Sequence, residues 1–166
     1  MTRGYDYRAT RVATSGRYYH GTASNFDKFD LDKAGARDYG DFGVGVYLTP
    51  SGHLAGMYAY DAAKKTGGEP VVLQVRVRAH KTADFDDVEL QKQVAQALGI
   101  PFPEKALNTG LGKQTRPASE AKAITQYMQS LGYDSGLARN GKELVVYDSH
   151  DISIEEVHPA ADAKYL

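Results

Sequence analysis

The chain has 166 residues, of which 42% are hydrophobic and 25% charged, as is typical of a soluble globular domain. Twenty basic residues against 21 acidic ones leave a formal net charge of −1, which excludes the strong overall positive charge of a general nucleic-acid binder. The length predicts one domain over residues 1–166, and no apolar run is long enough to span a membrane. The start of the sequence fits a free-standing protein or an excised domain.

Cysteine is absent, which excludes disulfides, thiol nucleophiles and cysteine-rich zinc sites. Four of the five histidines lie far apart and lack the spacing of metal ligands: His53, His80, His150 and His158. We therefore expect no metal. The lack of cysteine fits a cytoplasmic site of action, and it equally suits a domain that unfolds for delivery from another cell.

The first half of the chain predicts two short strands and a helix. Aromatic residues lead to a glycine in Arg17–Thr22, which indicates a strand running into a turn. The polar stretch Ser24–Phe42 predicts a long loop of the kind that is usually functional or mobile. Val44–Thr49 predicts the next strand. Ser51 is the expected cap of a helix that ends at Gly67-Gly68 and carries one apolar face, Leu54, Met57, Tyr58 and Ala62.

The middle of the chain predicts a strand, a helix and a connector. Apolar residues alternate over Val71–Ala79, so Arg76 and Arg78 share the opposite face, as a solvated surface or a small basic patch. Asp86 or Asp87 is the expected cap of a helix with the apolar positions Leu90, Val94, Ala97 and Leu98. Three prolines and three glycines between Gly99 and Pro117 indicate a connector.

The last third predicts a helix from Ser119 to Gly132 and three short strands, Ser135–Ala138, Glu143–Tyr147 and Ile152–Val157. Asn140-Gly141 is a strong hairpin signal between the first two strands. Short strands and a few helices without regular alternation predict a single α+β domain.

Two segments contain candidate site residues near glycines. In Tyr19-His20-Gly21-Thr22, the histidine could bind a ligand, act as a base or be a satisfied surface residue, while the glycine lets a ligand approach the backbone. The segment Gly43–Tyr47 matches neither a dinucleotide-binding fingerprint nor a phosphate loop, and Tyr47 could be a core residue or a ligand contact.

Tyr58 lies eleven residues after Tyr47. Two such rings can sandwich a planar cationic ring, although Tyr58 could also pack with its helix neighbours. Glu143 begins an otherwise apolar strand and is either a solvated strand end or a carboxylate that binds a sugar hydroxyl and stabilises positive charge.

The order of these segments resembles the His-Tyr-Glu branch of the ADP-ribosyltransferases, shared by diphtheria toxin and the poly(ADP-ribose) polymerases. Tyr-His-Gly-Thr comes first, then Gly-Val-Tyr-Leu-Thr, a tyrosine eleven residues on, and Glu-Leu-Val-Val-Tyr-Asp near the end. Within this branch, the chain resembles the small transferase domains of bacterial polymorphic toxins and phage polyvalent proteins. The resemblance extends over a core from about residue 17 to 158 and implies two small, mostly antiparallel sheets around a central NAD⁺ cleft, flanked by helices.

The resemblance also implies roles for the individual residues. His20 would bind the adenosine-side ribose, Gly21 would hold the nicotinamide carboxamide through its backbone, and Thr22 would lie beside it. Tyr47 and Tyr58 would stack on nicotinamide. Glu143 would bind the nicotinamide-ribose 2′-hydroxyl and stabilise the oxocarbenium-like charge. The loop from Asp27 to Asp41 would cover the dinucleotide.

Two positions depart from related patterns. The Arg-Ser-Glu branch has an acidic residue or glutamine two positions before its catalytic glutamate, where this chain has Gly141, which disfavours that branch. The polymerases commonly place a serine eight residues after the first tyrosine, and Ala55 stands there. One nicotinamide contact is therefore in doubt.

The leading hypothesis is a monomeric mono-ADP-ribosyltransferase, acting as a toxin or effector on a protein or RNA and paired with an immunity protein. An NAD⁺ glycohydrolase would use the same site with water as the acceptor. A catalytically silent NAD⁺- or ADP-ribose-binding module and a structural domain with chance motif matches are the remaining alternatives.

Overall fold

The computed structural model describes residues 16–23, 41–102 and 116–166. The predicted loop at Ser24–Phe42 and the predicted connector at Gly99–Pro117 lie mostly outside these ranges, as does most of the cover expected at Asp27–Asp41. Within the described ranges, no helix is long and apolar enough to cross a membrane.

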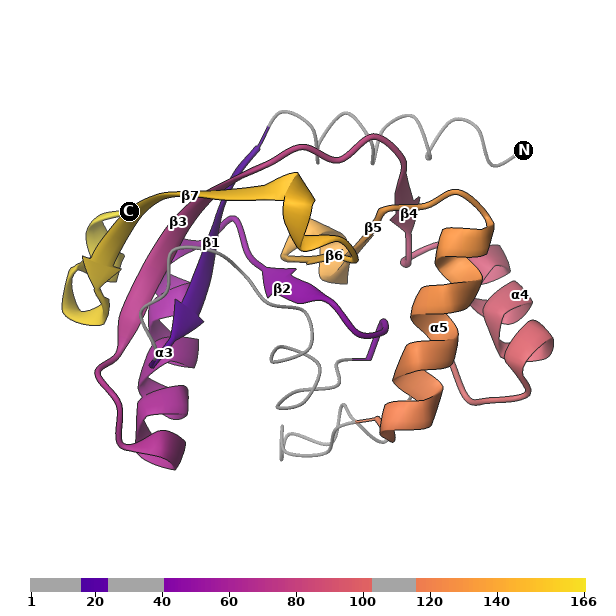
Figure 1. Ribbon diagram of the computed structural model, residues 1–166, viewed down its shortest axis with the longest axis horizontal. Coiled ribbons are helices and arrows are strands. Elements are labelled where there is room, and N and C mark those ends of the chain that lie inside the picture. Colours follow the sequence, from indigo (N-terminus) through magenta and orange to yellow (C-terminus); the bar gives the residue numbers. More distant parts are fainter. Residues whose placement is uncertain (1–15, 24–40, 103–115) are drawn as a thin grey trace.

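In the described part of the chain, seven strands form two sheets that lie next to each other (Figure 1). The antiparallel three-stranded sheet has the order β1 (Arg17–Thr22), β3 (Val71–Val77), β7 (Ile152–Pro159). The four-stranded sheet has the order β2 (Val46–Leu48), β6 (Glu143–Val146), β5 (Ser135–Ala138), β4 (Thr82–Asp84). Only the pairing of β4 with β5 is parallel among these strands. An isolated bridge between Tyr19 and Thr49 joins β1 to the residue that follows β2.

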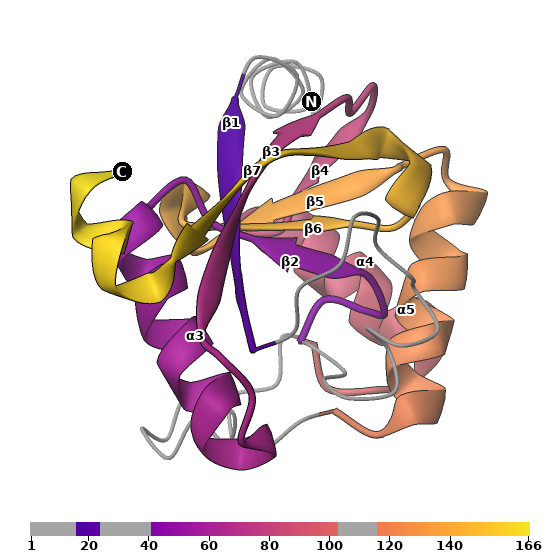
Figure 2. The same ribbon diagram turned by 60° about the vertical axis from the view of Figure 1, so that its left-hand side comes forward.

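Helices cover the two outer faces of this pair of sheets. α3 (Gly52–Thr66) packs on the three-stranded sheet, and α4 (Val88–Leu98) and α5 (Ala118–Ser130) lie together against the four-stranded sheet (Figures 1 and 2). Three short 3₁₀ turns complete the described elements: η2 (Arg139–Gly141), η3 (Ser149–Asp151) and η4 (Ala160–Tyr165).

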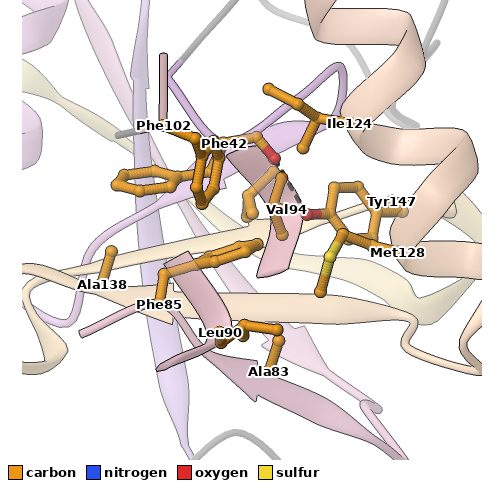
Figure 3. Close-up of a cluster of buried hydrophobic side chains, with 11 residues drawn as sticks. Phe42, Ala83, Phe85, Leu90, Val94, Phe102, Ile124, Met128, Ala138 and Tyr147 are labelled. Carbon is orange, nitrogen blue, oxygen red and sulfur yellow. Dashed lines mark hydrogen bonds between the residues drawn. The ribbon is translucent and has the colours of Figure 1, made fainter. Parts of the chain in front are cut away.

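The buried residues form three clusters that correspond to these layers. The first fills the space between the sheets and includes Tyr18, Leu73, Val75, Leu144 and Val146. The second lies under α4 and α5, where Phe42, Phe85 and Phe102 meet Ile124, Met128 and Tyr147 (Figure 3). The third joins α3 to β1, β3 and η4 through small residues, Ala55, Ala59, Ala160 and Ala163. Packing thus continues past residue 158, the expected end of the core.

The predicted caps are confirmed at α3 and α4, and the prediction is wrong in detail at α5. The apolar face predicted for α3 is wrong: Met57 and Tyr58 are half-exposed, and the helix buries Ala55, Gly56 and Ala59 instead, because it packs closely through small residues on β1 and η4. Ser51 caps α3 by accepting a hydrogen bond from the Leu54 amide, and Gly67 ends that helix with a left-handed backbone. Asp87 caps α4. α5 begins one residue before Ser119 and has no side-chain cap, because Pro117 holds the capping position.

The strands differ from the prediction mainly at the edges. β3 ends at Val77, so the predicted shared face of Arg76 and Arg78 is cut short, and Arg76 forms an ion pair with Glu155 at 3.0 Å. The polar-face position Gln74 is buried, because α3 and η4 cover that side of the sheet. The expected α+β class with two small sheets is confirmed.

Candidate active site

The two sheets meet at a hydrogen bond between His20 and Tyr47. Residues two apart in a strand point to the same face, so His20 faces the four-stranded sheet together with Tyr18, which lies in the cluster between the sheets. The His20 Nδ1 atom lies 2.9 Å from the Tyr47 carbonyl oxygen. Thr22, two residues on, lies on the same face at the end of β1.

Gly21 points the other way, toward α3. A Cβ atom at Gly21 would come within 1.9 Å of the Ala55 carbonyl oxygen and 2.7 Å of the Ala59 nitrogen. The glycine is therefore required by the close approach of α3, a packing reason that the sequence interpretation did not include. Ala55, which stands where the polymerases have serine, is fully buried in this contact.

The backbone of Gly21 lies on the outer edge of the three-stranded sheet. Tyr19 exchanges both backbone hydrogen bonds with Thr49, at 2.8 and 3.0 Å, on the side away from β3. Because alternate residues of an antiparallel strand direct their N–H and C=O to the same side, those of Gly21 follow this outer edge as well. A planar amide can be recognised by such a pair of backbone groups.

The ring of Tyr47 is fixed by its own hydroxyl. The hydroxyl donates to the Gly43 carbonyl at 2.6 Å and accepts from the Phe42 amide at 3.1 Å. Burial raises the Tyr47 pKa well above its ordinary value, with smaller contributions from Tyr147 and Glu143. Tyr47 therefore stays a neutral phenol with a fixed ring orientation.

Glu143 and Tyr47 lie on one face of the four-stranded sheet. Tyr47 pairs with Val145 across β2 and β6, and Glu143 precedes Val145 by two residues. The electrostatic influence of Glu143 on Tyr47 agrees with this placement. The structure thus links His20 to the Tyr47 backbone and places the side chains of Tyr47 and Glu143 on one face of the four-stranded sheet.

Arg139 bridges two carboxylates beside this junction. Its Nη2 atom lies 2.8 Å from Asp41 Oδ2, and its Nε atom lies 3.4 Å from Glu143 Oε1. Burial lowers the Arg139 pKa, but Glu143, Asp41 and Tyr58 outweigh that effect and raise the pKa above its ordinary value. Tyr58, on α3, is half-exposed.

Arg139 was not predicted as a site residue from the sequence. Asp41 was included, as the last residue of the loop expected to cover the dinucleotide. Only the spacing of four residues between Arg139 and Glu143 hinted at a contact. The pairing with Asp41 joins residues 98 positions apart, which no local pattern signals. Among the described residues, no group of three or more histidine, aspartate or glutamate side chains could hold a metal ion.

Two solved structures are similar to this chain to different degrees. A structure from the M. tuberculosis MbcT–MbcA toxin–antitoxin complex covers 91% of this chain and 90% of its own, with 14% identity and a TM-score of 0.57, which indicates a shared fold. An anti-CRISPR protein covers 86% of this chain and 98% of its own at 11% identity, but its TM-score of 0.36 is too low to indicate one. No curated protein matches the sequence.

The family comparison extends over most of the chain. The family model described as "ADP-Ribosyltransferase in polyvalent proteins" matches residues 15–156. That range contains both sheets except the last residues of β7, the three described helices and every candidate site residue. ADP-ribosyltransferases use NAD⁺ as a substrate. The chain belongs to the family of ADP-ribosyltransferases found in polyvalent proteins.

Proposed function

We propose that this domain is a mono-ADP-ribosyltransferase of the His-Tyr-Glu branch, with His20, Tyr47 and Glu143 as its central residues. The observation that supports this most strongly is the junction itself. His20 hydrogen-bonds the Tyr47 backbone across two sheets, and Glu143 shares the sheet face of Tyr47. These two relationships support a site built from the start, the middle and the end of the chain.

The part of the site proposed to bind NAD⁺ is inferred from the hydrogen bonds that its residues can make. The Tyr47 carbonyl can only accept, so His20 Nδ1 carries the proton and a neutral ring presents Nε2 as an acceptor for a ribose hydroxyl. The outer-edge N–H and C=O of Gly21 suit the nicotinamide carboxamide, with Thr22 beside it. Tyr47 supplies a fixed aromatic wall, and Tyr58 on α3 supplies the second.

The reaction needs stabilisation of one developing positive charge. As the bond from ribose C1′ to nicotinamide nitrogen breaks, nicotinamide leaves with the bonding electron pair and positive charge grows on the ribose. A fixed Glu143 carboxylate at the 2′-hydroxyl stabilises that charge electrostatically. The acceptor oxygen or nitrogen then bonds to C1′ and gives up its proton.

The acceptor is a macromolecule, protein or RNA, and the role is that of a toxin or effector acting in the cytoplasm as a monomer, held in check by an immunity protein. The similar fold in a structure described as a toxin–antitoxin complex supports this role. NAD⁺ hydrolysis, with water as the acceptor at the same site, is the alternative enzymatic outcome. A module that binds NAD⁺ without turnover is the non-enzymatic one.

Labelled NAD⁺ separates these outcomes. The purified domain is incubated with NAD⁺ labelled in the adenylate part, alone and with lysate fractionated into protein and RNA. We expect label on one macromolecular fraction, and none with Glu143→Gln. Free ADP-ribose alone would assign hydrolysis, and binding without turnover would assign a silent module. A wild-type protein that neither binds nor consumes NAD⁺ would refute the proposal.

A further inference from the structure

Arg139 and its partners form a charged cluster beside Glu143, and its geometry goes beyond the three central residues. The guanidinium contacts Asp41 at 2.8 Å and Glu143 at 3.4 Å. Both carboxylates are largely buried, with side-chain exposures of 15% and 21%, whereas Arg139 is 46% exposed. The cation therefore covers two partly desolvated carboxylates from the solvent side.

Asp41 is itself held by a buried arginine. The Nε atom of Arg116 donates to the Asp41 carbonyl at 3.0 Å, and the Arg116 side chain is fully buried. A second buried contact comes from Tyr147, whose hydroxyl donates to the adjoining Phe42 carbonyl at 2.8 Å. The backbone that carries the Asp41 side chain is thus held by hydrogen bonds from two buried side chains.

The backbone of Arg139 is held in an uncommon conformation. Arg139 and Asn140 both have positive φ, 54° and 57°, and such a conformation is costly for residues other than glycine. The Asp86 carboxylate compensates by accepting both amides, that of Arg139 at 3.1 Å and that of Asn140 at 2.9 Å. These bonds fix the tight turn between β5 and β6 from which the Arg139 side chain extends.

We propose that Arg139 is a positioning residue for Glu143, directed by Asp86 through the backbone and by Asp41 through its side chain. This inference rests on the proposed function of Glu143. Because Asp41 takes the shorter contact, Arg139 orients the Glu143 carboxylate without neutralising it.

Steady-state kinetics of nicotinamide release test the proposal. Replacing Arg139 with alanine should lower kcat by roughly 10- to 100-fold, because a misplaced catalytic group costs about that much, and should leave KM for NAD⁺ within about threefold. Arg139→Lys should recover part of the loss, since an ammonium can still pair with one carboxylate. Asp86→Ala should lower kcat in the same direction.

Arg76→Ala is the matched control. Arg76 is 52% exposed and pairs with Glu155 through Nε at 3.0 Å, on the sheet that does not contain Glu143. We expect its kcat to equal that of the wild type, and thermal unfolding should show every variant folded. If Arg139→Ala keeps full kcat while Glu143→Gln loses it, the proposed function stands and the positioning role is wrong. A large rise in KM with unchanged kcat would also overturn it, because Arg139 would then be a binding contact.

A second measurement does not depend on turnover. The carboxyl carbon of Glu143 is titrated by NMR without NAD⁺, in the wild type, Arg139→Ala and Arg76→Ala. Loss of a cation at this distance should raise the titration midpoint of Glu143 by about one pH unit, and the control should leave it in place. An unchanged midpoint in Arg139→Ala would mean that Arg139 does not act on Glu143.

Discussion

His20 and Tyr47 are 27 positions apart in the chain, yet a 2.9 Å hydrogen bond from the imidazole Nδ1 to the Tyr47 carbonyl joins them across the two sheets. The bond selects one tautomer, because a carbonyl oxygen cannot donate. The same ring therefore has a structural nitrogen and, at Nε2, an acceptor on its opposite side.

Replacing His20 with alanine removes both contacts. We expect the dissociation constant for NAD⁺ to rise about fivefold, since one hydrogen bond contributes about 1 kcal/mol. Calorimetric titration with NAD⁺ measures this. His158→Ala is the control, because His158 bonds to Gln74 on the other face of the three-stranded sheet. Equal affinity in His20→Ala and the wild type would contradict the ribose role.

Gly21→Ala tests the packing of α3 on β1. The new methyl group would lie 1.9 Å from the Ala55 carbonyl oxygen, a backbone atom that cannot move alone. We expect the free energy of unfolding in urea to fall by about 2 kcal/mol or more. Gly67→Ala is the comparison: its φ is +77° but its Cβ meets nothing within 4 Å, so only a backbone cost of about 1 kcal/mol is expected. A smaller loss at Gly21 than at Gly67 would show that α3 tolerates the methyl group.

Gly21 also shows where sequence interpretation stops. The glycine after the strand histidine was interpreted as a point of approach for a ligand, whereas the structure gives it a packing reason, the close approach of α3. The approaching group could not be named, because Ala55 lies 34 positions away and its contact depends on how α3 lies on β1. The residues that cap α3 and α4 were predictable, since a cap depends on neighbours in the chain.

Contacts across long sequence separations were not predictable. The apolar alternation of β3 indicated one exposed face, but burial of Gln74 depends on α3 and η4, which lie elsewhere in the chain. The strand β4 was not predicted, because a segment of three residues is too short to show an alternation of apolar and polar residues. A role for Arg139 could not be predicted for the same reason, since Asp41, with which it pairs, comes from another part of the chain.

Tyr47→Phe separates the ring of Tyr47 from its hydroxyl. The substitution removes the bonds to Gly43 and Phe42 while the aromatic wall remains. We expect a loss of roughly 1–3 kcal/mol in the free energy of unfolding, with NAD⁺ turnover retained below the unfolding temperature. Tyr47→Ala should lose both stability and turnover. Tyr60→Phe on the exposed side of α3 should change neither. Full turnover in a folded Tyr47→Ala would contradict the stacking role.

Two aspartates near η3 should affect stability with opposite dependence on pH. Hydrogen bonds from the amide and ring of His150 lower the Asp148 pKa below its ordinary value of 3.8, so its contribution is present above that pH and is lost as the pH falls. Burial, with Asp134 and Asp148 nearby, raises the Asp151 pKa. Its contribution is therefore greatest below pH 3.8 and is lost as the pH rises through the raised value.

Thermal unfolding of the two asparagine variants measures this difference. At pH 7, Asp148→Asn should unfold at a lower temperature than the wild type and Asp151→Asn at a higher one. Both differences should shrink as the pH falls below the ordinary carboxyl range. If both substitutions changed the unfolding temperature in the same direction at pH 7, the opposite pKa shifts assigned to the two aspartates would be wrong.

The most direct test of the central claim is the rate of nicotinamide release from NAD⁺ by the wild type and Glu143→Gln, in the presence of the lysate fraction that accepts label. Glutamine keeps the shape of the side chain and removes its charge. We expect a loss of about 100- to 1,000-fold in kcat, as for other groups that stabilise a transition-state charge. Glu155→Gln is the matched control. Glu155 is a partly buried glutamate on β7 that pairs with Arg76, and its substitution should keep the wild-type rate. Equal rates in Glu143→Gln and the wild type would show that Glu143 is not the catalytic carboxylate.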